Sequence, residues 1–266
     1  YTLVGQDADD FPPVPTPGED AATFSIDASA LGQALDRTIF SAARDTKRPV
    51  LRAVNWRVEE DRLTLTTVDG FRLSKITLTL KQAVGSAEGN VPVASCDHLR
   101  RLLNKGADGV VDVTIGATLA QFDVGRSLCL TAQLTQGTFP NYEQIIPDSF
   151  VCEAEIEVRP FLAAVGAAYA VVKNASGIVR FVLANNDITI TSKAEEEGEY
   201  AEAVPVLSMR GTARFALDGG YVIELLKAVG VDRITLSVPA GGDKPRLFST
   251  ADGDYRHVIM PGVVQW

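Results

Sequence analysis

Hydrophobic and polar positions alternate with a period of two over most of the chain, which predicts many strands and few helices. Leu31, Leu35 and Ile39 instead recur every four residues, and this spacing predicts a helix over 28–45. Further helices are predicted over 96–106, 160–173 and 219–229. In the first half of the chain, strands are predicted over 51–58, 63–68, 73–80, 110–115, 121–124 and 128–134.

An Asp-Gly pair interrupts the strand pattern in the stretch TTVDGFRLS, residues 66–74. Asp-Gly is a frequent hairpin turn sequence because both central positions tolerate positive φ. The turn alone does not explain why Phe71, Arg72 and Leu73 follow it directly. From the residues alone, these three side chains either pack a core or line a binding site.

The strand and helix pattern of the first half recurs in the second half. Residues 24–35 and 154–165 both read as a strand that runs into a helix. Residues 91–103 and 217–229 repeat the same arrangement without a gap. Such a period indicates a tandem duplication, and each copy is predicted to be an α+β unit whose helices cover one face of antiparallel sheets.

The first residues of the chain look like the end of one more copy. Residues 4–15 resemble 134–147, the segment that closes the first complete unit. We therefore expect the start of the chain to be the tail of a further copy of the unit, with Tyr1–Val4 as the end of a strand. The expected units are 1–20, 21–148 and 149–266.

Composition narrows the possible functions. The net charge of −9 and the pI of about 4.8 argue, taken alone, against a nucleic-acid binder. Cys96, Cys129 and Cys152 each lie among apolar neighbours and are expected to be buried, reduced thiols. His98 and His257 are the only histidines and lie far apart in the sequence. The sequence therefore argues against a zinc site or a Ser-His-Asp triad. No apolar run approaches the ~20 residues that span a bilayer.

Five segments occur in the order and at the spacing of a known family. They are RPVLRAV (48–54), VDGFRLS (68–74), GTFPNYEQIIP (137–147), GYVIELLKA (220–228) and VIMPG (258–262). Together they resemble the bacterial sliding clamp, the β subunit of DNA polymerase III, over its middle and C-terminal domains. The resemblance implies tandem DNA-clamp (processivity-fold) domains, with antiparallel sheets outside and two helices per domain lining a DNA channel.

The same resemblance implies a non-catalytic protein without a cofactor, located in the cytoplasm at the nucleoid. In the family, three-domain subunits form a homodimeric ring around duplex DNA without regard to its sequence. Short peptide motifs then attach the polymerase III catalytic subunit, the clamp loader, repair polymerases and ligase. This chain, read as a fragment, is expected to be a monomer that keeps the peptide groove.

Carried over position by position, the resemblance places the groove between the two units. The middle domain is expected to contribute Leu51, Val68, Gly70, Phe71, Arg72, Leu73, Pro140, Gln144 and Ile145. The C-terminal domain is expected to add Asp218, Tyr221, Pro245, Val258, Met260, Pro261, Gly262 and Val263. The apolar members suit a leucine or aromatic anchor. The charged head of Arg72 is expected at the rim of the groove.

Three positions depart from the family pattern. Val68 stands where threonine is usual, Asp218 where asparagine is usual, and Gln144 where arginine is common. The chain also continues past Gly262 to Trp266, which could shield the groove, add an anchor or be disordered. These differences predict a peptide preference unlike that of better-known family members.

Charge is distributed unevenly between the predicted helices and the rest of the chain. The helices as predicted carry seven basic and four acidic residues, although the whole chain has a net charge of −9. A mildly basic lining inside an acidic shell suits a protein that encloses DNA and slides. Basic helix surfaces are also common without any such role. The expected DNA-facing residues are Arg37, Arg44, Lys47, Arg48, Arg100, Arg101, Lys105, Lys173 and Lys227.

Two alternatives belong to other classes of protein. An enzyme could hold a divalent metal with Glu195, Glu196, Glu197 and Glu199, but successive strand residues point to opposite faces and converge poorly on one ion. A solvated hairpin loop explains this acidic run better. The other alternative is a peptide-binding adaptor that does not encircle DNA.

Overall fold

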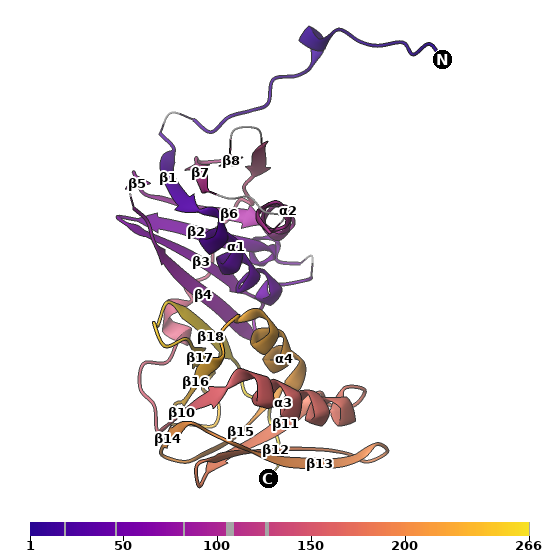
Figure 1. Ribbon diagram of the computed structural model, residues 1–266, viewed down its shortest axis with the longest axis vertical. Helices are drawn as coiled ribbons and strands as arrows, with labels where there is room; N and C mark the ends of the chain where they lie inside the picture. The colour runs from indigo at the N-terminus through magenta and orange to yellow at the C-terminus, as the bar shows by residue number, and fades with distance from the viewer. Residues whose placement is uncertain (19, 46, 82, 105–108, 126–127, 266) are drawn as a thin grey trace.

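The computed structural model describes residues 1–265 except 19, 46, 82, 105–108 and 126–127. Two α+β units follow one another along the long axis of the molecule, and α1–α4 are aligned along one side of it (Figure 1). The first unit contains β1 (Ala22–Asp27), α1 (Ala28–Asp36), β2 (Ala53–Glu59), β3 (Arg62–Val68), β4 (Arg72–Thr79), β5 (Ala83–Val84), β6 (Ala87–Pro92), α2 (Val93–Leu103), β7 (Val110–Ile115), β8 (Leu119–Val124) and β9 (Leu128–Gln133).

The second unit repeats this plan with small changes. It contains β10 (Cys152–Glu157), α3 (Val158–Val172), β11 (Ile178–Ala184), β12 (Asp187–Ala194), β13 (Gly198–Pro205), β14 (Ser208–Arg210), β15 (Ala213–Asp218), α4 (Gly219–Ala228), β16 (Arg233–Val238), β17 (Arg246–Ser249) and β18 (Tyr255–Ile259). Short 3₁₀ turns are η1 (Ala8–Asp10), η2 (Ile39–Ser41), η3 (Pro49–Arg52) and η4 (Glu143–Ile145).

One sheet crosses from the first unit into the second. In the described part of the chain its strand order is β14-β10-β16-β17-β18-β4-β3-β2-β6, and we call it the long sheet. The crossing is the antiparallel pair β4–β18, in which Leu73 lies opposite Val258 and Ser74 opposite His257. Backbone hydrogen bonds therefore join the two units directly, in addition to the linker between them.

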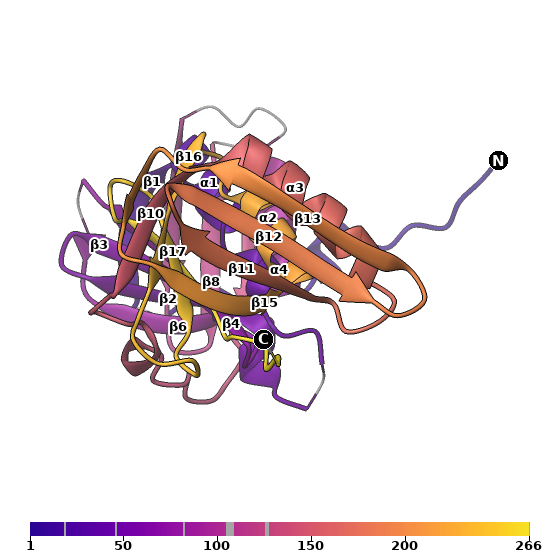
Figure 2. The ribbon, with the colours of Figure 1, turned by 90° about the horizontal axis from the view of Figure 1, so that it is seen from below.

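Each unit also has a sheet of its own, and helices pack between the sheets. The described residues form the sheet β5-β1-β7-β8-β9 in the first unit and β13-β12-β11-β15 in the second. Figure 2 shows the latter sheet crossing over α3 and α4. Phe161 on α3 is fully buried against Phe181 on β11, and Trp56 on β2 packs against Phe122 on β8. Apolar burial thus holds α3 against its sheet and joins the two sheets of the first unit.

The first helix is shorter than the sequence predicts. Asp27 caps it by accepting a hydrogen bond from the N–H of Ala30 (2.9 Å), but α1 ends at Asp36 and not at residue 45. Beyond it the chain turns inward, and the buried hydroxyl of Thr38 donates to the carbonyl of Ala34 (2.8 Å). The chain then continues as η2, where the buried Ser41 hydroxyl contacts the hydroxyls of Thr67 and Ser74.

Three smaller expectations are also wrong. Tyr1–Val4 form no strand, because these residues are exposed and pair with no sheet in the described structure. Leu51 lies in η3 and not in β2, since Pro49 opens a 3₁₀ turn there. Cys129 is exposed on β9, whereas Cys96 and Cys152 are buried. Burial raises the pKa of the Cys96 thiol to about 12, which keeps it protonated and unreactive.

Candidate functional site

The β3–β4 hairpin carries the turn that the sequence predicts. Gly70 has a φ of +102°, and the Asp69 carboxylate accepts hydrogen bonds from the N–H groups of Phe71 (2.8 Å) and Arg72 (2.9 Å). This side-chain bracket holds the Phe71 ring outward, where it is 63% exposed. The carbonyl of Phe71 accepts from the N–H of Met260 (2.8 Å), so the hairpin is tied to the end of β18.

An apolar cluster lies beneath this hairpin, at the point where the long sheet passes between the units. Its buried members come from both units and include four predicted groove residues. The set is Ala43, Leu51, Val68, Leu73, Phe139, Tyr142, Leu247 and Val258. We call it the junction cluster. Because its members are buried, they form a closed floor.

Exposed apolar side chains surround that floor. Phe71 and Met260 belong to segments joined by a backbone hydrogen bond, and Met260 is 38% exposed. We call this pair the lip. Ile145 on η4 is 39% exposed. The structure thus brings together apolar groups of the two units that lie far apart in the sequence.

Arg72 does not hold its charged head at a rim, contrary to the sequence-based expectation. Its side chain is only 3% exposed. The guanidinium donates to Asp69 (2.9 Å) and to the carbonyl of Phe40 (2.9 Å), and it pairs with Glu224 of α4 (2.6 Å). It also stacks over the Tyr221 ring, 4.2 Å from the centroid. Arg72 therefore locks the hairpin onto α4, because two of its partners, Tyr221 and Glu224, lie on that helix.

Beside Arg72 lies a cavity of about 360 Å³, which we call the junction pocket. It is enclosed by the β3–β4 turn, the chain after η2, the end of α3 and the start of α4. The charged side chains lining it are Arg44, Asp45, Asp69, Arg72, Asp218 and Glu224. Phe71, Tyr169 and Tyr221 supply aromatic walls. Burial, and after it the charge of Asp69, raises the pKa of Tyr221.

The remaining predicted groove residues lie on loops around the junction. Gly262 donates from its N–H to the carbonyl of Ala216 (2.8 Å), and a Cβ added there would be 2.9 Å from Ile178. The chain therefore passes close against β11 and β15 after Met260. Pro140, Gln144 and Val263 are exposed, while Pro245 and Pro261 are half-buried. Trp266 lies outside the described residues.

Sequence reasoning missed three residues of this region. Glu224 bridges Arg44 and Arg72, Tyr169 walls the junction pocket, and Phe40 supplies a carbonyl to Arg72. Glu224 follows Tyr221 by three residues on α4, a spacing that places both on one helix face. That spacing could have identified Glu224 from the sequence. Tyr169 and Phe40 have no such signal, because only tertiary packing brings them to the site.

The predicted positive charge of the helices depends on the residues that end them. Between their described bounds, α1–α4 carry four basic and three acidic residues. Arg37 and Lys173 cap the ends of α1 and α3, and including them restores the predicted excess. Lys173 and Lys227 are exposed, whereas Lys105 lies outside the described residues.

Several predicted DNA-facing arginines already have acidic partners. Arg100 contacts Asp36 (2.9 Å) and Asp97 (2.7 Å), and Arg101 also pairs with Asp97. Arg44 is 78% exposed but pairs with Glu224 (2.9 Å). Each such pair weakens the field that would act on phosphate.

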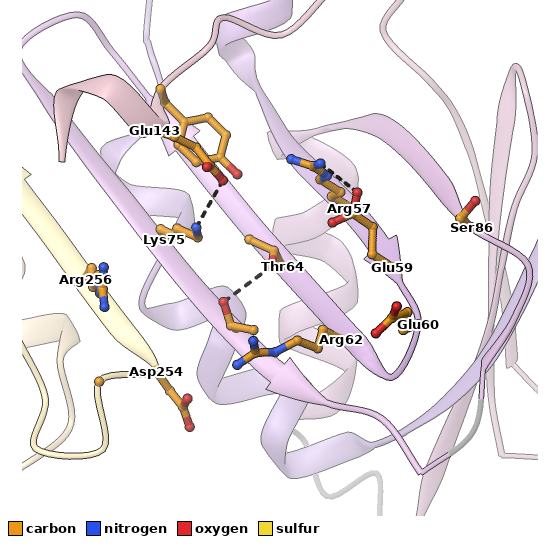
Figure 3. A pocket seen from close by; sticks show the side chains of 13 residues that line it. Arg57, Glu59, Glu60, Arg62, Thr64, Lys75, Ser86, Glu143, Asp254 and Arg256 are labelled. Atoms are coloured by element: carbon orange, nitrogen blue, oxygen red, sulfur yellow. Dashed lines mark hydrogen bonds and ion pairs between the residues drawn. The ribbon is translucent and has the colours of Figure 1, made fainter.

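The outer face of the long sheet carries a larger cavity of about 730 Å³ (Figure 3). Figure 3 shows that charged side chains of both signs surround it, including the pairs Arg57–Glu59 (2.6 Å) and Lys75–Glu143 (3.5 Å). An apolar anchor would have to displace water from these charged groups. This cavity therefore does not fit a leucine or aromatic side chain.

The acidic run of the enzyme alternative lies in the hairpin between β12 and β13, where Glu195, Glu196, Glu197 and Glu199 are exposed. Within the described part of the chain, no group of three or more histidine, cysteine, aspartate or glutamate residues is placed to hold a metal ion. The described helices include none that is both long and apolar enough to cross a membrane.

Two tandem α+β units, a sheet continuous between them, and helices aligned on one side define a clamp-type protein. Comparison with known proteins identifies the family. The family model for the DNA polymerase III beta subunit central domain matches residues 25–141, and the model for its C-terminal domain matches 143–263. The chain belongs to the DNA polymerase III beta subunit family, whose members are non-catalytic processivity factors.

Individual relatives agree with this assignment. The beta sliding clamp of Synechococcus elongatus is 26% identical over 98% of this chain and 70% of its own length. That of Staphylococcus aureus is 22% identical over 98% and 69%. The solved sliding clamp of Bacillus subtilis superposes with a TM-score of 0.89 at 25% identity, covering 98% of this chain and 69% of that one.

Proposed function

We propose that this chain is part of a processivity clamp that encloses duplex DNA and holds partner enzymes at the groove between its two units. The observation that carries the proposal is the lip of Phe71 and Met260, joined through their backbones (2.8 Å) beside the junction cluster. Exposed apolar side chains at a rigid junction are what a short peptide anchor needs.

The peptide partners in this proposal are the polymerase III catalytic subunit, the clamp loader, repair polymerases and ligase, acting at the nucleoid in the cytoplasm. The floor of the groove is closed by Leu51, Leu73 and Val258, which are buried. An anchor therefore enters beside Met260, whose flexible side chain can move without breaking the strands. In this proposal the predicted residues Pro140, Gln144, Ile145, Pro245, Pro261 and Val263 line the rest of the groove.

A peptide titration tests the groove. We expect a fluorescein-labelled synthetic peptide of the glutamine-and-leucine type to bind saturably in a polarisation assay. Met260→Asp should weaken binding about tenfold or more, because a carboxylate would replace an apolar contact at the centre of the interface. Leu207→Asp, at a comparably exposed apolar position away from the groove, is the matched control.

Circular dichroism confirms that each variant is folded. Equal affinity of the parent chain and Met260→Asp would contradict the location of the groove. No binding by the parent chain would contradict the peptide-tethering function altogether.

The DNA part of the proposal rests on the alignment of α1–α4 along one side of the molecule (Figure 1) and on the exposed basic residues Arg44, Lys173 and Lys227. The adaptor alternative predicts no topological retention on DNA. The assembled clamp should stay on circular plasmid during gel filtration and slide off linear plasmid. Equal retention on both forms would favour the adaptor.

A further inference from the structure

The junction pocket contains a negative charge that the protein does not neutralise. Asp69 and Glu224 both pair with Arg72, and Glu224 also pairs with Arg44. Asp45 lies 3.9 Å from Arg48. Asp218 differs, because the described residues place no lysine or arginine within ion-pair distance of its carboxylate.

The Asp218 carboxylate is fixed in place by the start of α4. Its Oδ1 atom accepts hydrogen bonds from the N–H groups of Gly220 (2.8 Å) and Tyr221 (3.2 Å). These bonds cap the helix but bring no full positive charge. A Cβ added at Gly177 would lie 3.6 Å from the Oδ2 atom, so small residues leave space beside that oxygen.

Aromatic rings complete the surroundings of this carboxylate. Tyr169 and Tyr221 line the same pocket, and Phe71 stands exposed at its mouth. A Cβ at Gly220 would be 3.1 Å from the Tyr169 hydroxyl, which shows how closely that ring approaches the cap of α4. An unneutralised carboxylate among aromatic rings favours a cation over an anion or a neutral group.

The pocket is also next to the proposed peptide site. Phe71 belongs both to the lip and to the lining of the pocket. A peptide whose anchor packs on the lip would therefore place a flanking side chain at the mouth of the pocket. The cavity of about 360 Å³ has room for the end of a long side chain.

We propose that the junction pocket binds an arginine or lysine side chain that flanks the apolar anchor of a partner peptide, with Asp218 as its counter-charge. The proposal rests on the peptide-tethering function above and adds a charge preference to it. The guanidinium or ammonium group lies against the aromatic walls and pairs with Asp218. A peptide with an acidic residue at that position is disfavoured by the unpaired charge of Asp218.

Three peptides test this preference. Each has the same glutamine-and-leucine core, and the residue flanking the anchor, scanned through successive positions, is arginine, citrulline or glutamate. Citrulline keeps the shape of arginine without its charge. At the best position and low salt, arginine should bind roughly three- to fivefold tighter than citrulline, and glutamate weaker than either. The preference should shrink in 500 mM NaCl, because salt screens exposed charges.

A variant without the Asp218 charge tests whether that carboxylate causes the preference for arginine. Asp218→Asn keeps a capping oxygen for α4, so the variant should fold, but it removes the charge. The ratio of arginine to citrulline affinity should then fall towards one. Glu195→Gln removes one carboxylate from the distant β12–β13 hairpin and should leave that ratio unchanged.

Two results would overturn the proposal. Equal affinities for the arginine, citrulline and glutamate peptides would show that the pocket does not discriminate by charge. The proposed peptide binding at the groove would not be contradicted. An arginine preference that persists in Asp218→Asn would place the counter-charge elsewhere. Failure of the citrulline peptide itself to bind would instead contradict the proposed function, and the charge preference with it.

Discussion

Buried polar side chains hold the two units together at the scale of single residues. Ser74 on β4 contacts the Nδ1 atom of His257 on β18 (2.7 Å) and the hydroxyl of Ser41 (2.8 Å). The His257 ring stacks on Phe40 at 5.4 Å and is fully buried. Burial, together with the nearby charge of Arg72, holds the pKa of His257 well below its usual range. This histidine is therefore neutral in the folded protein.

The first prediction concerns the pH dependence of stability. The unfolded chain protonates His257 near pH 6.5, whereas the folded protein does not, so the unfolded state binds more protons below that pH. The free energy of unfolding should fall as pH decreases below 6.5, by up to about 1.4 kcal/mol per pH unit from this residue. Urea unfolding at pH 7.0, 6.0 and 5.5 measures the slope.

The exposed His98 provides the matched control for that experiment. His257→Gln should reduce the slope, because it removes the group that takes up the proton. His98→Gln should leave the slope close to that of the parent chain. An unchanged slope in His257→Gln would contradict the assignment of a neutral buried histidine.

Some residues of the site could be predicted from the sequence, and others could not. The Asp69-Gly70 turn and the apolar character of Leu73 and Val258 follow from local pattern. The orientation of Arg72 does not, because its partner Glu224 lies about 150 positions away in the sequence. A side chain with a long apolar stem was therefore expected to reach solvent, whereas tertiary partners satisfied its charge inside the protein.

At the scale of elements, hydrogen bonds and close contacts decide where some helices and strands end, which hydrophobic periodicity alone does not predict. The alternating pattern over 110–115 predicts the bounds of β7 as observed, since a half-buried strand leaves a clear signature. The end of α1 was missed because Thr38 and Ser41 find hydrogen-bond partners that the pattern does not record. Ser41, for instance, contacts the Thr67 hydroxyl on β3 (2.6 Å).

The second prediction concerns the turn between β14 and β15. Gly211 has a φ of +75°, and a Cβ there would lie only 2.0 Å from the carbonyl oxygen of Val151. Gly253 has the same φ but an open surrounding. Gly253→Ala should lower the free energy of unfolding by about 1–2 kcal/mol from backbone strain alone. Gly211→Ala should lower it by at least about 1–3 kcal/mol more, because the backbone must shift.

Urea unfolding followed by circular dichroism compares the two glycine variants. The difference between the two losses of stability reports the steric clash, since both glycines have a φ of +75°. Equal losses of stability in the two variants would contradict the tight packing of the β14–β15 turn against β10.

At the scale of the whole molecule, the long sheet makes one structure of two units. The periodic pattern predicts the units but not the pairing of β4 with β18, because strand partners distant in sequence leave no local signal. The family resemblance alone pointed to a groove at that junction. The junction cluster and the Arg72–Glu224 pair (2.6 Å) add contacts across the same boundary.

The third prediction concerns cooperativity. Trp56 is buried in the first unit, and a Trp266→Phe background makes it the only tryptophan. Trp56 fluorescence and circular dichroism at 222 nm should give the same urea midpoint, because strands shared at the junction couple the units. Separate midpoints would show that the units unfold independently.

The pairing of β4 with β18 also has a mechanical consequence. Bending one unit against the other would distort the backbone hydrogen bonds between β4 and β18. The junction between the units therefore resists bending. The lip lies at the point where the long sheet crosses from one unit to the other. In the proposed clamp, the pull of an enzyme on a peptide bound at the lip would act directly on these paired strands and would be transmitted along them to the side that carries the helices.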